Sequence, residues 1–358
     1  MDNKIVIAAA GSRKTTLVVE EALKATDKKI LIVTYTIDNL QQIKNYMIQK
    51  NGAIPAHVNI QSWYSFLLSD GVRPYQNFLY DGARIPSIHF QEGRSARYVK
   101  KSNVDKYFLT KSRKIYTDKI SEFACLCNTK SKGLVMDRLE SIYDHIYFDE
   151  VQDLSGYDFD FLEILLLSNL CVTIVGDNRQ ATYFTNCSPK NSRFKGKNII
   201  NLFEQWENTG TCNIIEKFEC YRCNQMICDF SDKLYPEMSK TKSMNNKRTG
   251  HDGVFIVCED ELNDYYERYS PQILRDTVKT KTKGLPALNF GLAKGQNFDR
   301  VLIFPNNPIR NYLKKCDVTQ LKGVTKAKFY VGLTRARYSV AFFYEDETCF
   351  DEIKIYGL

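Results

Sequence analysis

The sequence lacks any apolar run long enough to cross a bilayer, and no charged-then-apolar leader precedes its first apolar stretch. Internal repeats and low-complexity tracts are also missing. These absences argue against a membrane-spanning protein and against a repeat protein. We therefore expect a cytoplasmic, globular protein with no membrane partner.

Histidine is scarce, with four residues in 358, whereas cysteine is frequent, with eleven. Four of the cysteines gather in one region and could be imagined as a zinc site: Cys212, Cys220, Cys223 and Cys228. Their spacing is irregular and His251 is distant, which favours small buried thiols over metal ligands. Because the total is odd and no export signal is present, we expect the cysteines to be reduced.

The length of 358 residues is enough for two domains, each with its own core. Hydrophobic residues make up 43% of the chain and aromatic residues 13%, which indicates an ordered globular protein rather than a disordered one. Lysine and arginine number 50 against 42 aspartates and glutamates, a net charge of +8. This moderate basic excess permits a polyanionic partner without proving one.

Apolar, strand-like runs alternate with amphipathic helices along the chain, which predicts an α/β fold with parallel sheets flanked by helices. From about residue 71 to 139 the pattern changes, because this segment is rich in Tyr, Lys and Ser and has no clear buried strand. We predict a first domain at 1–207 with a helical insertion at about 71–139, and a second α/β domain at 208–358. In this assignment the strand at 212–218 opens the second domain.

A strand, a short loop and a helix at the start of the sequence have the order of a phosphate-binding loop. The loop residues expected to bind a nucleotide are Ala10, Gly11, Ser12, Arg13, Lys14, Thr15 and Thr16. Such a loop points backbone N–H groups and a helix N-terminus at an anion. Lys14 would reach the β- and γ-phosphates, and the Thr15 hydroxyl would hold Mg²⁺. The strict pattern has Gly where Ala8 and Arg13 stand, so a structural turn is the alternative interpretation.

Two further strands end in polar motifs. The strand at 143–148 is followed by DEVQD at 149–153, and the strand at 171–175 by GDNRQ at 176–180. Ligands of open α/β sheets lie at the carboxyl ends of the strands, where these motifs would face a bound nucleotide. Three strands that end in a phosphate loop, an acid pair and Asp/Gln residues favour a nucleotide site over a purely structural domain.

Together these motifs resemble, in the same order and across nearly the whole chain, those of the UvrD/Rep group of superfamily 1 helicases. The resemblance implies two RecA-like P-loop NTPase lobes with parallel sheets, and ATP and Mg²⁺ as cofactors. The residues at 149–153 are similar to the group's Asp-Glu-x-Gln-Asp, which implies that Asp149 and Thr15 hold Mg²⁺ and that Glu150 activates the attacking water. The motif that ends in Gln180 looks like Gly-Asp-x-x-Gln, in which the Gln senses the γ-phosphate.

Three motifs in the second half of the chain also resemble the group. Tyr221-Arg222 resembles the Tyr-Arg pair that stacks on adenine and grips the γ-phosphate. The segment 293–299 looks like Ala-Lys-Gly-x-x-Phe-Asp and implies that Gly295 and Asn297 lie at the nucleotide, although Asn297 replaces a Glu. The segment 330–337 is close to Tyr-Val-x-x-Thr-Arg-Ala, which implies an arginine finger. The implied catalytic residues are Glu150, Gln180, Arg222 and Arg335.

The resemblance further implies contacts with single-stranded or partly duplex DNA. The residues concerned are Thr34, Tyr35, Thr36, Ser62, Trp63, Tyr64 and Tyr183. For each aromatic residue among them, a place in the hydrophobic core is the alternative interpretation.

Several positions depart from the family pattern. Arg13 replaces a Gly, which would cost about 1–2 kcal/mol if the backbone there has a positive φ, although its cation could add a phosphate contact. The Gln-containing adenine motif ahead of the phosphate loop is missing, and Ile37-Asp38 stands where the family has Asn-Lys. The span from Arg222 to Ala293 is too short for the family's large second-lobe insertion.

These observations predict an ATP-dependent DNA helicase or translocase, an ATP hydrolase in which one triphosphate is held by Lys14 and by arginines of the second lobe. The alternative is a nucleotide-gated regulatory subunit that binds ATP or DNA and controls a partner nuclease without processive unwinding. It resembles in outline the helicase-like subunits of bacterial anti-phage systems such as Gabija, which would imply a role in antiviral defence. An inert structural α/β protein is the third interpretation.

Overall fold

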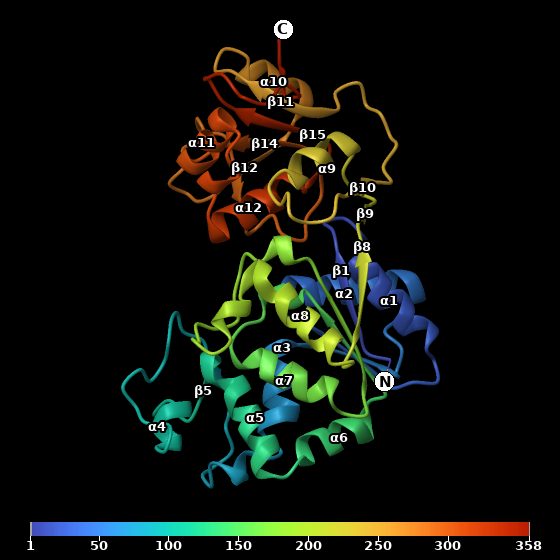
Figure 1. Cartoon of the computed structure of the whole chain (residues 1–358), viewed down its shortest axis with the longest axis vertical. Helices are drawn as coiled ribbons and strands as arrows, with labels where there is room; N and C mark the ends of the chain where they lie inside the picture. Colours follow the sequence, from blue (N-terminus) through green and yellow to red (C-terminus); the bar gives the residue numbers. More distant parts are fainter. Residues whose placement is uncertain (1, 358) are drawn as a thin grey trace. The chain divides into compact units, whose positions relative to one another are not determined.

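The computed structural model describes residues 2–357 and divides into two compact units. The first unit contains the residues up to Ile7, Lys14–Asn178 and Tyr183–Glu216. The second contains Ala8–Arg13, Arg179–Thr182 and the chain from Lys217 onward. Each unit is built on its own six-stranded sheet, which confirms the predicted α/β fold class with two parallel sheets (Figure 1).

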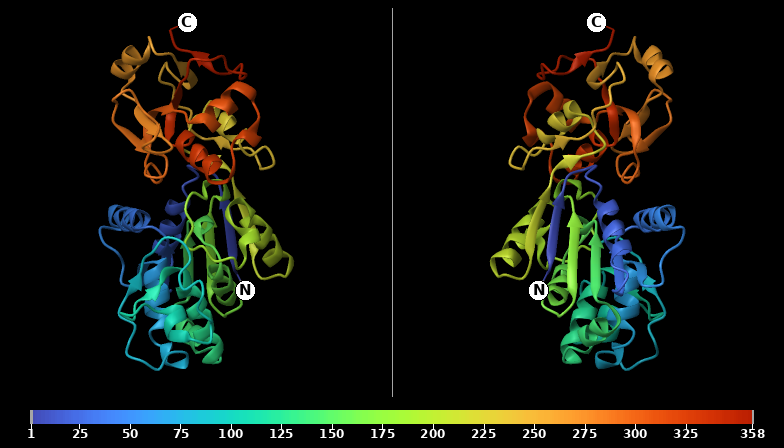
Figure 2. Two further views of the ribbon diagram at one scale, coloured as in Figure 1. Left: turned by 90° about the vertical axis from the view of Figure 1, so that its left-hand side faces the viewer. Right: turned by 90° about the vertical axis from the view of Figure 1, so that its right-hand side faces the viewer.

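The first sheet has the strand order β3-β2-β6-β7-β1-β8. Its strands are β1 (Lys4–Ala8), β2 (Ile30–Thr34), β3 (Val58–Ser62), β6 (His145–Asp149), β7 (Cys171–Gly176) and β8 (Asn213–Lys217). The pairings among β3, β2, β6, β7 and β1 are parallel. Figure 2 shows the blue β1 beside the green β7, although the two are far apart in the sequence. Because helices cover both faces of such a sheet, β2 and β6 are buried along their whole length.

The parallel register brings the carboxyl ends of these strands to one edge of the sheet. Ser62 pairs with Thr34, and Thr34 pairs with Asp149, at the ends of β3, β2 and β6. Ile7 of β1 pairs with Gly176, the last residue of β7. The motifs found in the first half of the sequence therefore follow strands that end side by side.

The helices of the first unit cover this sheet. They are α1 (Lys14–Lys24), α2 (Ile37–Asn51), α3 (Trp63–Phe66), α4 (Val104–Phe108), α5 (Ile120–Lys130), α6 (Leu134–Ile142), α7 (Tyr157–Leu166) and α8 (Ile199–Asn208). Capping fixes the ends of α2, because the Thr36 hydroxyl accepts a bond from the Asn39 N–H and Gly52, with φ 80°, ends the helix. The segment at 71–139 contains α4, α5 and part of α6, together with a short parallel pair of strands, β4 (Ile88–His89) and β5 (Ile115–Tyr116).

The position of β8 differs from the expected domain assignment. We assigned the strand at 212–218 to the second domain, but β8 is the edge strand of the first sheet, beside β1. The buried side chain of Asn3 gives the physical reason. Its amide donates to the carbonyl oxygens of Leu166 (2.8 Å) and Thr211 (3.1 Å) and accepts from the Val172 N–H (2.9 Å). These bonds fasten the segment before β8 to the first unit.

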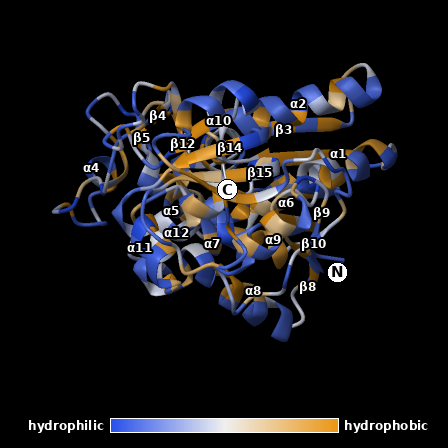
Figure 3. Ribbon diagram, turned by 90° about the horizontal axis from the view of Figure 1, so that it is seen from above, coloured by the Kyte–Doolittle hydropathy of each residue, from blue (hydrophilic) through white to orange (hydrophobic). Residues whose placement is uncertain are grey.

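The second sheet has the strand order β13-β12-β14-β15-β11-β16, with parallel pairing throughout. Its strands are β11 (Gly253–Val257), β12 (Gln272–Arg275), β13 (Ala287–Asn289), β14 (Phe298–Phe304), β15 (Ala336–Phe343) and β16 (Lys354–Ile355). Its helices are α9 (Gln225–Asp232), α10 (Leu262–Tyr269), α11 (Asn307–Lys315) and α12 (Gly323–Leu333). The pair β9 (Glu219–Cys220) and β10 (Lys242–Ser243) lies outside the sheet. The orange of β14 and β15 in Figure 3 marks the hydrophobic centre of this unit.

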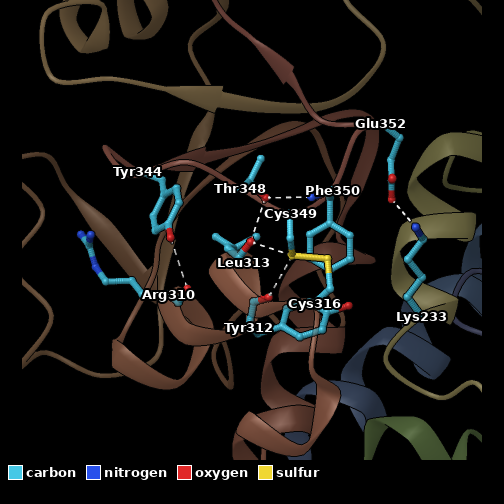
Figure 4. The surroundings of a disulfide bond; sticks show 10 residues. All are labelled: Lys233, Arg310, Tyr312, Leu313, Cys316, Tyr344, Thr348, Cys349, Phe350 and Glu352. Atoms are coloured by element: carbon cyan, nitrogen blue, oxygen red, sulfur yellow. Dashed lines mark hydrogen bonds and ion pairs between the residues drawn. A yellow bond between two sulfur atoms is a disulfide. The ribbon is translucent and has the colours of Figure 1, made fainter.

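A disulfide joins Cys316, which follows α11, to Cys349 (Figure 4). The expectation that all cysteines are reduced is therefore wrong for this pair. The Cys349 N–H and the Thr348 hydroxyl both donate to the Leu313 carbonyl, at 3.1 and 2.9 Å, and hold the two segments together. The two cysteines are 33 residues apart in the sequence, and only the fold of the second unit makes them neighbours.

Two further findings concern metal ions and membranes. Among residues 2–357, no group of three or more His, Cys, Asp or Glu side chains is placed so that it could hold a metal ion. Within the same part of the chain, no helix combines the length and the apolar character that crossing a membrane requires.

His145, at the start of β6, gives the first unit a stability that depends on pH. Its ring stacks on Tyr147 with 4.0 Å between the ring centroids, and it shares a 2.9 Å hydrogen bond with the Thr173 hydroxyl. Burial, followed by the charges of Lys28 and Lys4, lowers the pKa of His145 to about 4.

We predict that this histidine destabilises the protein in mild acid. The unfolded chain binds the proton near pH 6.5 and the folded chain only near pH 4, so the stability is full above pH 6.5 and falls as the pH drops through this window. At about pH 5 the loss is about 2 kcal/mol. Urea unfolding at about pH 7.5 and about pH 5 measures it, and His145→Gln should reduce the difference by about 2 kcal/mol. A second loss should remain in the variant, because burial also lowers the pKa of His251, in the second unit, to about 4. An equal loss in the variant would contradict the assignment to His145.

Candidate functional site

The predicted phosphate loop lies between the end of β1 and Lys14, the first residue of α1. Its path requires glycine at Gly11, where φ is 77° and where a Cβ would lie 2.8 Å from both the Cβ of Arg222 and the Sγ of Cys220. The Ser12 hydroxyl oxygen is buried and has no hydrogen-bond partner among the described residues. An unsatisfied buried hydroxyl is costly, so this atom fits a loop that is completed by an anion.

The backbone φ of Arg13 is 63°, so this residue has the positive φ at which a side chain is energetically costly. A residue with a Cβ in this left-handed conformation is destabilised by about 1–2 kcal/mol relative to the right-handed one. Its guanidinium carbon lies 4.0 Å from the centroid of the Tyr221 ring, and both residues belong to the second unit. The loop therefore brings two predicted nucleotide-binding residues into contact with each other.

The last residue of β6, Asp149, is buried beside the start of α1. The Thr15 hydroxyl donates a 2.9 Å hydrogen bond to the Asp149 carboxylate, although the two residues are 134 positions apart. Burial raises the pKa of Asp149 to about 7, and the neighbouring charge of Glu150 adds to the rise, while the Thr15 bond and the charge of Lys14 oppose it. A hydroxyl and a carboxylate are oxygen ligands that suit Mg²⁺, which often binds through one or two carboxylates plus substrate phosphates.

Glu150 follows in a left-handed conformation with φ 62°, which turns its side chain away from the path of β6. The Gln152 amide donates a short hydrogen bond to the Glu150 carboxylate and accepts from the Asp177 N–H at 3.0 Å. Gly176 makes this approach possible, because a Cβ there would lie 2.7 Å from the Gln152 side-chain oxygen. Gln152 therefore links the ends of β6 and β7. We did not single it out from the sequence, although it stands inside the acid motif.

In the second unit, Gln180 and Arg335 are neighbours. The Arg335 guanidinium donates to the Gln180 side-chain oxygen at 3.3 Å and to the Gln296 carbonyl at 3.4 Å, and its Nε donates to the Val331 carbonyl at 3.2 Å. Lys294 Nζ donates to the Gln180 carbonyl at 3.5 Å. The predicted γ-phosphate sensor and the predicted arginine finger thus lie together with a second cation. Arg335 is only 2% exposed, so its charge is held in place by these contacts.

Arg222 lies close to the segment that contains Arg335, since its guanidinium donates to the Thr334 carbonyl at 2.9 Å. Gly295 has a φ of 86° and turns the chain just before Gln296. Asn297 lines a separate hollow of about 860 Å³ in the second unit, together with Tyr269 and Arg300. Asn297 stands in the chain between two residues that bond to Arg335, since the Gln296 carbonyl accepts from the Arg335 guanidinium and the Phe298 N–H donates to the Arg335 carbonyl at 2.9 Å.

Most of the residues predicted to contact DNA line one groove of the first unit. The groove has a volume of about 1110 Å³. The predicted residues that line it are Tyr35, Thr36, Ser62, Tyr64 and Tyr183. The Tyr64 ring meets Tyr35 edge to face at 5.8 Å, and its hydroxyl donates to the Thr185 carbonyl at 2.5 Å. Tyr35, directly after β2, and Tyr64, in α3, therefore form an aromatic wall.

Phe90 extends this wall and was not found from the sequence. Its ring meets Tyr64 edge to face at 5.6 Å, and its side chain is 69% exposed. It lies in the segment at 71–139, where no motif marked it. The only signal in the sequence was the richness of that segment in aromatic residues.

Two predicted DNA contacts, Thr34 and Trp63, have buried side chains. Trp63 is 1% exposed, packs edge to face on Phe148 and Phe161, and donates its indole N–H to Asp158 at 3.1 Å. The Trp63 side chain therefore lies in the hydrophobic core, which is the alternative that we stated for the aromatic residues. A role of Trp63 in contacting DNA stays a prediction.

Asp158, in α7, connects the core to the wall of the groove. Besides Trp63, its carboxylate accepts from the Ser155 N–H at 3.0 Å, from the Asn186 amide at 3.3 Å, and from the hydroxyls of Ser121 and Thr185. Burial raises the pKa of Asp158, and these donors oppose the rise. Because Thr185 and Asn186 line the groove, this one carboxylate fixes part of its wall.

Residues 86–195 match the family model described as the UvrD/REP helicase N-terminal domain. This segment includes Phe90, the acid pair Asp149 and Glu150, and Gln180. These residues are similar to that domain, which confirms for this segment the resemblance to the UvrD/REP group first read from the motifs. A more specific likeness to the subunits of anti-phage systems stays a prediction.

The chain is also similar to solved structures of an arterivirus protein. It matches the crystal structure of Arterivirus nonstructural protein 10 (helicase) with 14% identity and a TM-score of 0.48, covering 96% of this chain and 59% of that one. The complex of the same protein with DNA matches with 14% identity and a TM-score of 0.49, covering 98% of this chain and 62% of that one. The chain thus spans about three fifths of the length of these proteins. No curated protein matches the sequence.

We predict that Asp158→Ala destabilises the first unit by about 2–4 kcal/mol, because it leaves the Trp63 indole and other buried donors without an acceptor. The matched control is Asp160→Ala on the same helix, whose carboxylate pairs with the half-exposed Lys190 and should lose less than about 1 kcal/mol. Urea unfolding followed by tryptophan fluorescence measures both. Similar losses in the two variants would show that the buried carboxylate has no special part.

Proposed function

We propose that the protein is an ATP-dependent helicase or translocase that acts on single-stranded or partly duplex DNA. The observation that carries the proposal is the hydrogen bond between Thr15 and Asp149, because it joins the phosphate loop to the acid motif at the carboxyl ends of parallel strands. The buried, unsatisfied hydroxyl of Ser12 supports an anion in the same loop. The match of residues 86–195 to the UvrD/REP helicase domain supports the reaction class.

In this proposal the loop, the start of α1 and the acid motif have separate tasks. The loop N–H groups, the N-terminus of α1 and Lys14 bind the phosphates. Thr15 and Asp149 would hold Mg²⁺, which would supply positive charge next to the phosphates. Glu150 orients and deprotonates the attacking water, and the Gln152 amide keeps that carboxylate in place.

The residues of the second unit complete the proposal. Gln180, Arg222 and Arg335 would contact the γ-phosphate of the same nucleotide, and Tyr221 would lie against its base. A guanidinium that gains a charge-assisted bond only while the γ-phosphate is present makes the conformation depend on hydrolysis. Repeated binding and hydrolysis would then drive stepping along a DNA strand.

For DNA binding we propose the groove lined by Tyr35, Tyr64 and Phe90. Aromatic faces of this kind stack on bases of any sequence, and each stacked base contributes about 1–3 kcal/mol. Thr36 and Ser62 would supply hydrogen bonds to the backbone of the strand.

The second candidate is a nucleotide-gated subunit that controls a partner nuclease without processive unwinding. The observation that favours it is that both arginines already have hydrogen-bond acceptors within the protein. Arg222 donates to the Thr334 carbonyl, and the buried Arg335 donates to carbonyl and side-chain amide oxygens. Both side chains would have to exchange these bonds for phosphate contacts. A nucleotide-dependent exchange of this kind is what a switch requires, with or without movement along DNA.

ATP turnover with and without single-stranded DNA separates the two candidates. A helicase or translocase should hydrolyse ATP faster with DNA, and Glu150→Gln should lower the turnover about 100-fold or more. The matched control is Glu20→Gln, on the exposed side of α1, which should leave turnover unchanged. Turnover that ignores DNA would favour the regulatory subunit, and full turnover in Glu150→Gln would contradict the proposed base.

We predict that Phe90→Ala weakens the binding of an oligothymidine strand about 5-fold to 100-fold, because one stacking surface is lost. Phe78→Ala serves as the control, since Phe78 is exposed to a comparable degree, at 48%, and does not line the groove. Fluorescence anisotropy of a labelled oligonucleotide gives both affinities. If the two variants bind equally well, the groove is not the DNA site.

A further inference from the structure

The guanidinium of Arg13 covers the ring of Tyr221. The distance from the guanidinium carbon to the ring centroid is 4.0 Å, which is a cation–π contact. Tyr221 is 42% exposed and is therefore one of the few large aromatic side chains on the surface of the second unit. An exposed ring beside a phosphate loop is where the base of a bound nucleotide would be expected to stack.

The backbone holds Arg13 in this position. The Tyr221 N–H donates to the Gly11 carbonyl at 2.9 Å, and the Ala9 N–H donates to the Lys217 carbonyl at 2.9 Å. Gly11 lies so close to Arg222 that no Cβ would fit between them. With the loop fastened at both sides, the left-handed conformation of Arg13 aims its side chain at the Tyr221 ring.

We propose that Arg13 sets the affinity of this site for the base of a nucleoside triphosphate by occupying the ring face of Tyr221 that the base would use. The inference rests on the proposed function, because it takes the loop to bind the phosphates. The base of a nucleotide whose phosphates are held by the loop would approach Tyr221 from the side of the loop. The Arg13 side chain would reach the ring from the same side. The base must therefore displace the guanidinium before it can stack.

This competition has a consequence for substrate recognition. The triphosphate supplies most of the binding energy, while the stacking of the base is offset by the loss of the contact between Arg13 and Tyr221. The site should then bind nucleoside triphosphates with little dependence on the base. Arg13 is in this sense a residue that determines specificity, and it does not take part in the reaction.

The test compares the binding of Mg·ATP with that of inorganic tripolyphosphate, which has the phosphates and no base, by titration calorimetry on the full chain. Arg13→Gly frees the ring, so it should tighten ATP binding about twofold to fivefold and leave tripolyphosphate binding unchanged or weaker. Arg13→Lys keeps the charge and loses the planar stack, and it should give a smaller gain. In a Tyr221→Leu background, Arg13→Gly should bring no gain, because no ring is left to uncover.

The other outcomes overturn the inference in distinguishable ways. If Arg13→Gly weakens both ligands equally, Arg13 is a phosphate contact, and if it weakens ATP alone, Arg13 is a platform for the base. If the wild-type protein binds neither ligand, the proposed function itself fails. Thermal unfolding of each variant shows whether a loss of binding comes from a loss of folding instead.

Discussion

The hydrogen bond between Thr15 and Asp149 depends on the parallel register of the first sheet. The positions of the other residues at the carboxyl ends of these strands depend on the same register. Neither residue is near the other in the sequence, and only strands that end at the same edge bring them together. The same register places Thr34 beside Asp149 and Ser62 beside Thr34, and Ser62 lines the groove. One constraint therefore positions both the proposed nucleotide site and the proposed DNA groove.

Buried polar groups hold the ends of these strands in place. Asp158 gathers donors from the core and from the groove wall, and Gln152 joins the end of β6 to the end of β7. Such networks are costly when one partner is missing, because the remaining groups stay buried without a bond. They make the geometry of the site rigid, while the strained backbone at Arg13 and Glu150 marks the two places where that geometry departs from ordinary loops.

Much of the fold followed from the sequence, because buried parallel strands are continuous apolar runs and their motifs lie at predictable ends. The remainder depended on tertiary contacts that have no local signal. The side chain of Asn3 draws β8 into the first sheet, and folding of the second unit brings Cys316 to Cys349. At the proposed site, the motifs singled out Lys14 and Asp149 as candidates but not Phe90, since an exposed aromatic residue in a loop has no periodicity or spacing to mark it.

The central proposal, which comes from the motifs, is that Lys14 and Arg335 bind the same triphosphate. The most direct measurement is the affinity of a non-hydrolysable ATP analogue and of ADP, in the wild-type protein and in Arg335→Ala. The account predicts that the substitution weakens the analogue about tenfold or more and leaves ADP unchanged, because only the analogue offers a γ-phosphate to the guanidinium. Equal effects on the two nucleotides, or no effect on either, would contradict it.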